Sequence, residues 1–419
     1  MRCLSCLLFL AILSPVMAAD PLAVKTADSQ AVSIPTITWK KTVLDPRFRS
    51  EGVAAADVNK DGKKDVLNGE YWYEAPNWTK HEMQPPVDHG TGEHNYSRSF
   101  CCWTEDLNGD GYPDLIVIDF PGRPCYWMEN PKGDPNKHWK KHTIWHSACN
   151  ETPQYLDLFG TGKRVLIMGF QPVGKKDTDN DGQMAYFTPD PKDPTAMWIM
   201  HPISVPSAPG KPIPGTNRFS HGLGVGDLNK DGKLDVICTN GWWEQPKEVD
   251  GKTAWKFHPA NLGNACADMY AVDLDGSGTP GVLSTSAHQF GIWWHRQKPN
   301  PKGGESTFEQ VPLFGRLCSE THAAHYVDID GDGLKDLVTG KRFWSHGRSE
   351  PGHGWDARIY WLKAYKEKDG ALNFKPMLID DDCGVGTQFE VTDMNGDGLL
   401  DIVVSNKKGV RVVLQQRGN

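Results

Sequence analysis

The feature that most constrains this chain is a short acidic phrase, Asp-x-Asn/Asp-x-Asp-Gly-x-x-Asp, which recurs along most of its length. Five copies are complete, and two weaker copies begin at Asp157 and Asp273. The first acids of the seven copies stand at positions 57, 106, 157, 227, 273, 328 and 393, so successive copies lie 46 to 70 residues apart. A period of this length is typical of radial or solenoid repeat architectures.

The spacing within each phrase fits calcium, because a tight loop with oxygen-bearing side chains at alternate positions points them at one cation. The Gly permits the sharp turn. Apolar runs such as 114–118 follow the loops and read as strands, whereas an EF-hand continues into a helix. We therefore predict about five calcium loops placed between strands. Their predicted ligands are Asp57, Asn59, Asp61, Asp65, Asp106, Asn108, Asp110, Asp114, Asp227, Asn229, Asp231, Asp235, Asp328, Asp330, Asp332, Asp336, Asp393, Asn395, Asp397 and Asp401.

The sequence around each loop predicts four strands. An entering strand precedes the loop, an apolar strand follows it, an aromatic strand such as 71–73 comes next, and Trp or Phe opens the last strand. Seven units of this kind predict an all-β, seven-bladed β-propeller with four-stranded blades. Residues 36–44 read as a last strand without a loop before it, and the C-terminal unit ends without a last strand. We therefore predict that the N-terminal strand completes the C-terminal blade and closes the ring.

The chain outside the repeats predicts an extracytoplasmic protein. Residues 1–18 combine Arg2 with an apolar core and small residues, as in a cleaved signal peptide, which implies a secreted or periplasmic location. Residues 19–35 are expected to be a flexible segment, and residues 36–419 a single propeller domain. We expect the protein to be a monomer. No later apolar run is long enough to span a membrane. A net charge of −8 without a sustained basic run argues against a nucleic-acid surface.

The cysteines leave two states open. Eight remain after the predicted signal peptide, at positions 101, 102, 125, 149, 238, 266, 318 and 383. An even number in a secreted chain allows disulfides without fixing their pairing, and buried free thiols are the alternative.

With these loops and strands, the chain resembles the FG-GAP and VCBS repeat family over nearly the whole mature sequence. The resemblance implies calcium loops and an integrin-like seven-bladed propeller. That family includes adhesion proteins, lectins and polysaccharide lyases, so the fold alone does not choose a function.

Four histidines follow the repeat and are predicted to be structural. His81, His142, His201 and His258 each lie three residues after the Trp that opens a last strand. Repetition at one register indicates packing within the blade.

A different set of residues appears six positions before each first loop acid, where Glu51, Phe100, Glu151, His221, Ala267, His322 and Thr387 stand. At the rise of a strand this position lies about 20 Å from the calcium loop, at the opposite rim of the innermost strand. Pseudo-symmetry then brings the seven positions together around the axis. The candidate catalytic residues are His221, His322, Glu51 and Glu151. Candidate substrate-binding residues on the same rim are Arg98, His94, His146, Asp268, His288, His325, Lys341 and Arg342.

Two His and one or two carboxylates suit a divalent transition metal at the channel mouth, or an acid and base on either side of a substrate. A hydrated polar channel mouth is the alternative. The chain also resembles the propeller of aldos-2-ulose dehydratase at 127–131, at His146-Ser147 and around His322. That resemblance implies metal-assisted dehydration of a keto-sugar.

Three functions remain open from the sequence. The first is binding of a carbohydrate or protein ligand on the rim opposite the calcium loops. The second is a carbohydrate lyase or dehydratase, in which Arg98, Lys341 or Arg342 binds the substrate. The third is an adhesion or assembly scaffold, which needs only rigid loops.

Overall fold

The computed structural model describes residues 36–173, 182–208, 210–263 and 266–418. The predicted signal peptide at 1–18 and the segment 19–35 lie outside these residues. The described residues form 28 strands and no helix. The prediction of an all-β fold is therefore confirmed.

The strands form sheets of four, in which each strand pairs antiparallel with the next along the chain. The first three sheets contain β2 (Ala54–Ala56), β3 (Asp65–Leu67), β4 (Tyr71–Glu74) and β5 (Thr79–Glu82); β6 (Cys101–Glu105), β7 (Asp114–Ile118), β8 (Arg123–Glu129) and β9 (Lys140–Ala148); and β10 (Gln154–Leu156), β11 (Val165–Phe170), β12 (Gln183–Thr188) and β13 (Ile199–Pro202). A further sheet holds β22 (Ala324–Val327), β23 (Asp336–Gly340), β24 (Ile359–Lys366) and β25 (Leu372–Asp380).

One sheet has eight strands because two groups of four touch along their first strands. The groups are β14 (Leu223–Gly226), β15 (Asp235–Cys238), β16 (Gly241–Glu244) and β17 (Lys256–Pro259), and then β18 (Cys266–Val272), β19 (Gly281–Ser286), β20 (Phe290–Lys298) and β21 (Thr307–Ser319). β14 and β18 pair in parallel at only two positions. A Cβ on Gly224 would lie 1.9 Å from the backbone oxygen of Met269, so this close approach requires glycine.

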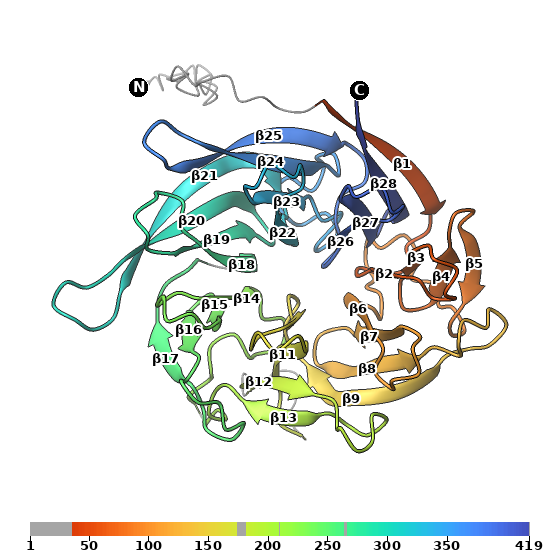
Figure 1. The fold of residues 1–419 in the computed structure, drawn as a ribbon, viewed down its shortest axis with the longest axis horizontal. Coiled ribbons are helices and arrows are strands. Elements are labelled where there is room, and N and C mark those ends of the chain that lie inside the picture. Colours follow the sequence, from red (N-terminus) through yellow and green to blue (C-terminus); the bar gives the residue numbers. More distant parts are fainter. Residues whose placement is uncertain (1–35, 174–181, 209, 264–265, 419) are drawn as a thin grey trace, which may run out of the picture. The chain divides into compact units, whose positions relative to one another are not determined.

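The two ends of the described chain share a sheet. β1 (Ile37–Asp45) pairs antiparallel with β28 (Gly409–Arg417), and β27 (Asp401–Asn406) and β26 (Glu390–Thr392) complete the order β1-β28-β27-β26. The predicted pairing of the N-terminal strand with the C-terminal unit is confirmed. The sheets have a propeller arrangement, with β2, β6, β14, β18, β22 and β26 toward its centre (Figure 1).

The acid that closes each complete loop begins the second strand of its sheet and joins three strands. Asp65 Oδ2 accepts a hydrogen bond of 2.9 Å from the N–H of Val58 in the loop, and Oδ1 accepts one of 2.8 Å from the N–H of Ala75 after the third strand. Asp114, Asp235, Asp336 and Asp401 repeat this pattern. These predicted calcium ligands therefore also hold the backbone of the blade together.

The four repeated histidines are part of the blade framework. His81, His142 and His258 stack on Trp72, Trp127 and Trp242 with ring centroids 4.1 to 4.4 Å apart. Each of the three also contacts a Glu that lies two residues after its Trp, at 2.7 to 2.8 Å. His201 stacks on Tyr186 instead.

All eight cysteines in the described residues are buried, and no disulfide joins any two of them. Burial raises the pKa of Cys102, Cys125 and Cys238 to about 12, which keeps these thiols protonated. Of the two states left open by the sequence, the structure has buried cysteines without disulfides. Within the same residues, no helix has the length and apolar character that a membrane crossing requires.

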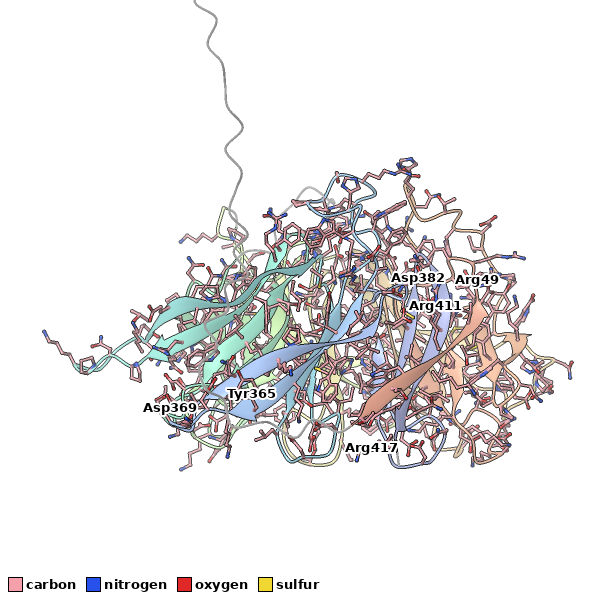
Figure 2. All side chains as sticks on the ribbon, turned by 90° about the horizontal axis from the view of Figure 1, so that it is seen from above. Arg49, Tyr365, Asp369, Asp382, Arg411 and Arg417 are labelled. Carbon is pink, nitrogen blue, oxygen red and sulfur yellow. The ribbon has the colours of Figure 1, made fainter. Side chains whose placement is uncertain are left out.

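The propeller has two distinct faces. In a view at right angles to the first, Arg417 and Asp369 lie in the lower part of the molecule, whereas Asp382 and Arg411 lie above them (Figure 2). Arg417 Nη2 donates a hydrogen bond to the backbone oxygen of Asp330, so the loop at 328–336 belongs to the first face. The group described next lies at the opposite ends of the inner strands.

Candidate functional site

The central group is built from residues that immediately precede three inner strands. Glu151 lies before β10, His221 before β14 and His322 before β22. Glu151 Oε2 is 3.2 Å from His322 Nε2 and 3.6 Å from His221 Nε2. One ligand atom from each side chain lies within 4.8 Å of the other two. The structure therefore brings together three of the four candidate catalytic residues, although up to 171 positions separate them in sequence.

Glu51, the fourth candidate, joins this group through Arg342. Arg342 follows β23, is 2% exposed and places Nη2 2.7 Å from Glu51 Oε1 and Nη1 3.3 Å from Glu151 Oε2. Ser97 also donates its N–H and its hydroxyl to Glu51 Oε2, at 3.2 and 3.1 Å. Glu51 is thus committed to Arg342 and Ser97, whereas Glu151 faces the histidines.

His288 extends the group outward from the loop between β19 and β20. Its Nε2 lies 2.9 Å from His221 Nε2, and its Nδ1 lies 3.4 Å from Glu350 Oε1. The His288 ring also stacks on His346 with centroids 4.6 Å apart. His346 Nδ1 is in turn 2.5 Å from Glu350 Oε1. His288 therefore connects the Glu151 group to a second set of ligand-type atoms.

The electrostatics of the group favour an ionised Glu151 carboxylate beside neutral imidazoles of His322 and His288. Burial, together with the charge of Arg342, lowers the pKa of His322 to about 3. Burial and the neighbouring His221 and His322 lower the pKa of His288 to about 2. Burial alone would raise the pKa of Glu151, but His221, His322 and Arg342 hold it well below its usual range. Neutral His nitrogens and one carboxylate form a donor set that suits zinc or another first-row transition metal.

The Nε2 atoms of His322 and His221 support that fit because both lie near Glu151 Oε2, whereas the Nδ1 atoms of two rings lack a partner. His322 Nδ1 and His288 Nδ1 are buried ring atoms that form no hydrogen bond in the described residues. Ring nitrogens in this state usually have a partner, because burying an unpaired polar atom costs free energy. The Nε2 atoms of both rings already point toward the centre of the group.

The other rim candidates have separate partners. Asp268 accepts hydrogen bonds from the N–H of Ala324 and from Gln154 Nε2, at 2.9 and 3.0 Å. His325 contacts the backbone oxygen of Phe389 and His146 that of Gln171, both at 2.8 Å. These three residues link neighbouring sheets.

The remaining basic candidates are also engaged or lie outside the group. Lys341 forms a buried ion pair with Glu320. Arg98 binds Asp119 through two hydrogen bonds, of 2.5 and 2.8 Å. His94 is exposed. Among the described residues, no hydrogen bond or ion pair joins any of the three to Glu151, His221 or His322.

His288, His346 and Glu350 form the second set of ligand atoms, called the outer set below. Two of its members, His346 and Glu350, were not predicted from the sequence. They belong to the long connection between β23 and β24, residues 341–358. Their spacing of four residues and their place in a long insertion are the only signals that the sequence carries.

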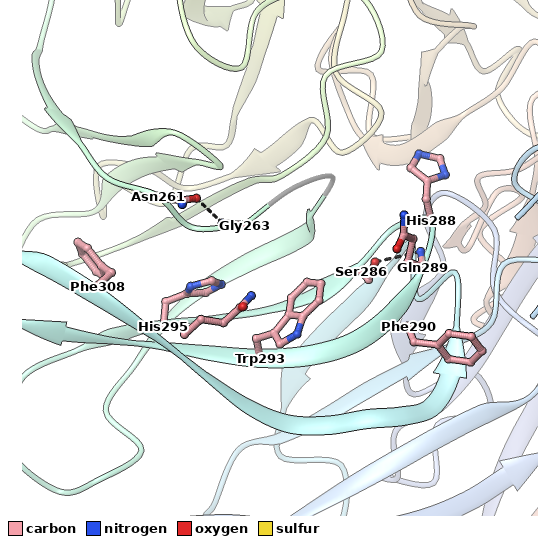
Figure 3. A pocket seen from close by; sticks show the side chains of 10 residues that line it. Asn261, Gly263, Ser286, His288, Gln289, Phe290, Trp293, His295 and Phe308 are labelled. Atoms are coloured by element: carbon pink, nitrogen blue, oxygen red, sulfur yellow. Dashed lines mark hydrogen bonds between the residues drawn. The ribbon is translucent and has the colours of Figure 1, made fainter. Parts of the chain in front are cut away.

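A cavity of about 490 Å³ adjoins His288. Figure 3 shows His288 at one end of the cavity and Phe308 at the other, with Trp293 and His295 between them. The amide side chains of Asn261, Gln289 and Gln310 also line it. Aromatic faces combined with amide donors and acceptors suit a polar ligand that has apolar faces, such as a sugar ring.

The predicted calcium loops also arrange oxygen atoms that fit a cation. In the first loop Asp57 accepts backbone N–H groups from Asp61 and Gly62, at 3.0 and 2.9 Å, so the loop is already curved around its carboxylates. Asn59 Nδ2 donates to Glu74 Oε1 at 3.0 Å, which brings a further carboxylate to the loop. Glu129 and Glu244 hold the corresponding strand positions in two other sheets. If calcium binds here, these oxygens are the donors that the chain offers.

The loop at 328–336 differs. Its third position is Asp330 instead of Asn, and the strand position of Glu74 is taken by Lys363. Lys363 is 1% exposed, and its ammonium group pairs with both Asp330 and Asp332. The His that accompanies the Glu elsewhere is replaced by Met377, which pairs with Trp361. This loop therefore already contains a cation of its own. Ligand atoms of Asp328, Asp330 and Asp332 lie within 4.8 Å of one another, so a metal ion bound here would compete with the Lys363 ammonium group.

No protein-family model and no curated protein matches the chain. Among solved structures, it is similar to the PQQ domain of a pyranose dehydrogenase from Coprinopsis cinerea, with 10% identity, 90% of this chain and 97% of that chain covered, and a TM-score of 0.41. A putative oxidoreductase (glucose dehydrogenase) from Thermus thermophilus is 11% identical, with 72% and 93% covered and a TM-score of 0.39. The Tc holotoxin pore of Photorhabdus luminescens is 16% identical over 84% of this chain, with a TM-score of 0.36.

This chain spans only 16% of the toxin's length. Similarities of this size carry no argument about activity, and the resemblance to FG-GAP and VCBS repeats stays a prediction. The fold described above rests on the strand pairing itself.

Proposed function

We propose that this protein holds a divalent transition metal between Glu151, His221 and His322 and uses it to act on a carbohydrate, as a lyase or dehydratase. The observation that carries the proposal is the convergence of buried Glu151 and His322 and partly buried His221 from three different sheets. The distances of 3.2 and 3.6 Å between their nearest atoms match the separation of ligand atoms that bind one metal ion. The alternative of a merely hydrated channel mouth is less consistent with His322, whose side chain is 0% exposed.

The architecture that we propose around this site is a calcium-stabilised, seven-bladed propeller of the FG-GAP and VCBS type. In this interpretation the eight-stranded sheet is two blades that touch through β14 and β18. A secreted or periplasmic location belongs to the same proposal.

The chemistry follows from the donor set. A divalent metal held by Glu151, His221 and His322 would supply Lewis-acid stabilisation to a carbonyl or carboxylate of the substrate, which makes the proton on the neighbouring carbon easier to remove. The electron pair of the broken C–H bond forms a C=C bond, while a hydroxyl or alkoxyl group leaves the next carbon and takes up a proton. His288, which is not among the three ligands and lies beside His221, is the imidazole that the chain offers as proton acceptor. Arg342 positions Glu151 and Glu51 through its two hydrogen bonds.

The cavity beside His288 favours a carbohydrate as the ligand and supports a second candidate function, binding without turnover. Its rings and amides would bind a sugar whether or not a reaction follows. A scaffold for adhesion or assembly has no comparable feature in its favour.

Two measurements test the proposal. Metal analysis of the purified protein should find a transition metal besides calcium, and a panel of acidic and keto-sugar polysaccharides and oligosaccharides should yield an unsaturated, ultraviolet-absorbing product. His322→Ala should abolish the product and the ion held by Glu151, His221 and His322, whereas His94→Ala, on the same rim but exposed, should change neither.

The outcomes separate the candidates. Metal binding and sugar affinity without turnover would favour the binding function. If the wild-type protein takes up no transition metal when zinc, manganese or iron(II) is supplied, the proposal is wrong.

A further inference from the structure

We infer that His288, His346 and Glu350 form a second transition-metal site, which shares His288 with the Glu151 group and makes the centre dinuclear. The inference rests on the proposed function, because the first metal is the one held by Glu151, His221 and His322. It adds a second ion and a mode of substrate binding.

The geometry of the outer set resembles that of the inner one. One ligand atom each from His288, His346 and Glu350 lies within 4.8 Å of the other two. Glu350 Oε1 is the common point, 2.5 Å from His346 Nδ1 and 3.4 Å from His288 Nδ1. Two imidazole nitrogens and a carboxylate oxygen are again the donors that zinc, manganese and iron accept.

His288 has one ring nitrogen directed at each set. Nε2 lies 2.9 Å from His221 Nε2, so a hydrogen bond between the two rings requires that one of these nitrogens carries a proton and the other does not. Nδ1 is buried and forms no hydrogen bond in the described residues, although Glu350 Oε1 is 3.4 Å away. A metal bound to Nδ1 would give this atom the partner that it lacks.

The insertion that supplies the outer ligands is fixed at its base. The N–H of Ser345 donates to Glu320 Oε2 at 2.7 Å, and Tyr96 donates its hydroxyl to the backbone oxygen of Ser345 at 2.8 Å. Lys407 Nζ donates to the backbone oxygen of Trp344 at 2.7 Å. These contacts hold the residue next to His346 in place, so the ring does not depend on a free loop for its position.

The outer site is open where the inner one is closed. The His346 side chain is 50% exposed, while that of Glu350 is 15% exposed and that of His288 14%. An ion here would have protein ligands on its inner side and room for water or substrate on its outer side. Open coordination positions are characteristic of catalytic sites, and paired metals can bind two oxygens of one substrate.

Metal stoichiometry tests the inference. Calcium-loaded protein freed of transition metals is titrated with zinc, and its bound metal is counted after gel filtration; cobalt(II) then reports the ligand field by its visible absorption. The wild-type protein should bind two ions per chain. His346→Ala and Glu350→Gln should each bind one, whereas Arg348→Ala, an exposed residue of the same insertion paired with Glu93, should still bind two.

Variants of the inner set distinguish the two proposals. Glu151→Gln should lose the inner ion and keep an outer ion that His346→Ala removes. A wild-type protein that binds a single ion, unaffected by His346→Ala, would overturn the dinuclear centre and leave the proposed function intact. A wild-type protein that binds none would overturn both. Unchanged melting of the His346→Ala variant in calcium would show that its lost ion is not the result of misfolding.

Discussion

Replacing Lys363 with Met should convert the loop at 328–336 into one that depends on calcium. Lys363 neutralises Asp330, whose side chain is 0% exposed, and Asp332, whose side chain is 37% exposed. Removing one partner of a buried pair typically costs about 3 to 5 kcal/mol, because the other charge is left without compensation. Since Asp332 is partly exposed to water, we expect the lower end, about 3 kcal/mol of unfolding free energy. Met keeps the unbranched stem but loses the contact of the Lys363 Nζ with the Trp361 ring, whose centroid is 5.6 Å away.

Calcium should return most of this loss. A cation that binds only the folded state at 100 times its dissociation constant stabilises that state by about 2.7 kcal/mol. We therefore expect Lys363→Met to unfold at lower urea concentration than the wild-type protein in chelator, with the gap closing to under about 1 kcal/mol in saturating calcium. Calorimetric titration should find one more calcium site in the variant than in the wild-type protein.

A neighbouring lysine provides the matched control. Lys366 lies on the same strand and is exposed, so Lys366→Met should change neither the calcium count nor the urea midpoint appreciably. The reasoning would be refuted by a wild-type protein in which the 328–336 loop binds calcium with Lys363 present. A deficit of the Lys363→Met variant that is the same in chelator and in calcium would refute it as well.

Two further predictions concern the blade framework. Deleting residues 36–44 should lower the melting temperature markedly, because it removes the strand paired with β28 and exposes an edge; a protein that melts unchanged would show that this pairing does not stabilise the ring. Burial, opposed by Arg164 and Lys64, raises the pKa of Glu390 from 4.5 to about 7, so the folded state holds this proton more tightly than the unfolded state. Stability should therefore fall as pH rises from about 4.5 through 7, and Glu390→Gln should reduce that loss in urea titrations at pH 5 and 8. Equal pH dependence in both proteins would contradict the assignment.

The sequence located the inner ligands because the repeat provides a register. Glu151, His221 and His322 occupy equivalent positions, and radial pseudo-symmetry brings equivalent positions to the axis. The same reasoning was less successful for His325 and Asp268. Side chains along a strand alternate in direction, so a shift of a few residues turns them from the channel to a neighbouring sheet. The register of the repeat predicts where a residue lies along its strand, whereas the contacts of its side chain depend on the direction in which that side chain points.

Two features of the site could not be predicted from the repeat. His346 and Glu350 lie in the long connection between β23 and β24, outside the strands that share the register of the repeat, so no register places them near His288. The loop at 328–336 shows the opposite problem, because its acidic phrase is complete and predicts calcium as strongly as the other copies do. Its difference lies 27 residues beyond Asp336, at Lys363, and becomes visible only when the third strands are aligned through the backbone groups that the closing acids bind.

The balance of charge at the centre supports an ion in the Glu151 group. Arg342 is the one guanidinium that contacts Glu51 and Glu151 in the described residues, and it lies closer to Glu51, at 2.7 Å, than to Glu151, at 3.3 Å. The other contacts of Glu151 are to imidazoles, and His322 is neutral because its pKa is lowered to about 3. His221, His322 and Arg342 hold the pKa of the buried Glu151 well below its usual range, so the carboxylate is ionised, and an anionic oxygen beside two imidazole nitrogens is a donor set that a divalent cation accepts. Arg342 would then stay with Glu51, which leaves Glu151 Oε2 free for the metal, and the guanidinium would fix both carboxylates without occupying the position of the ion.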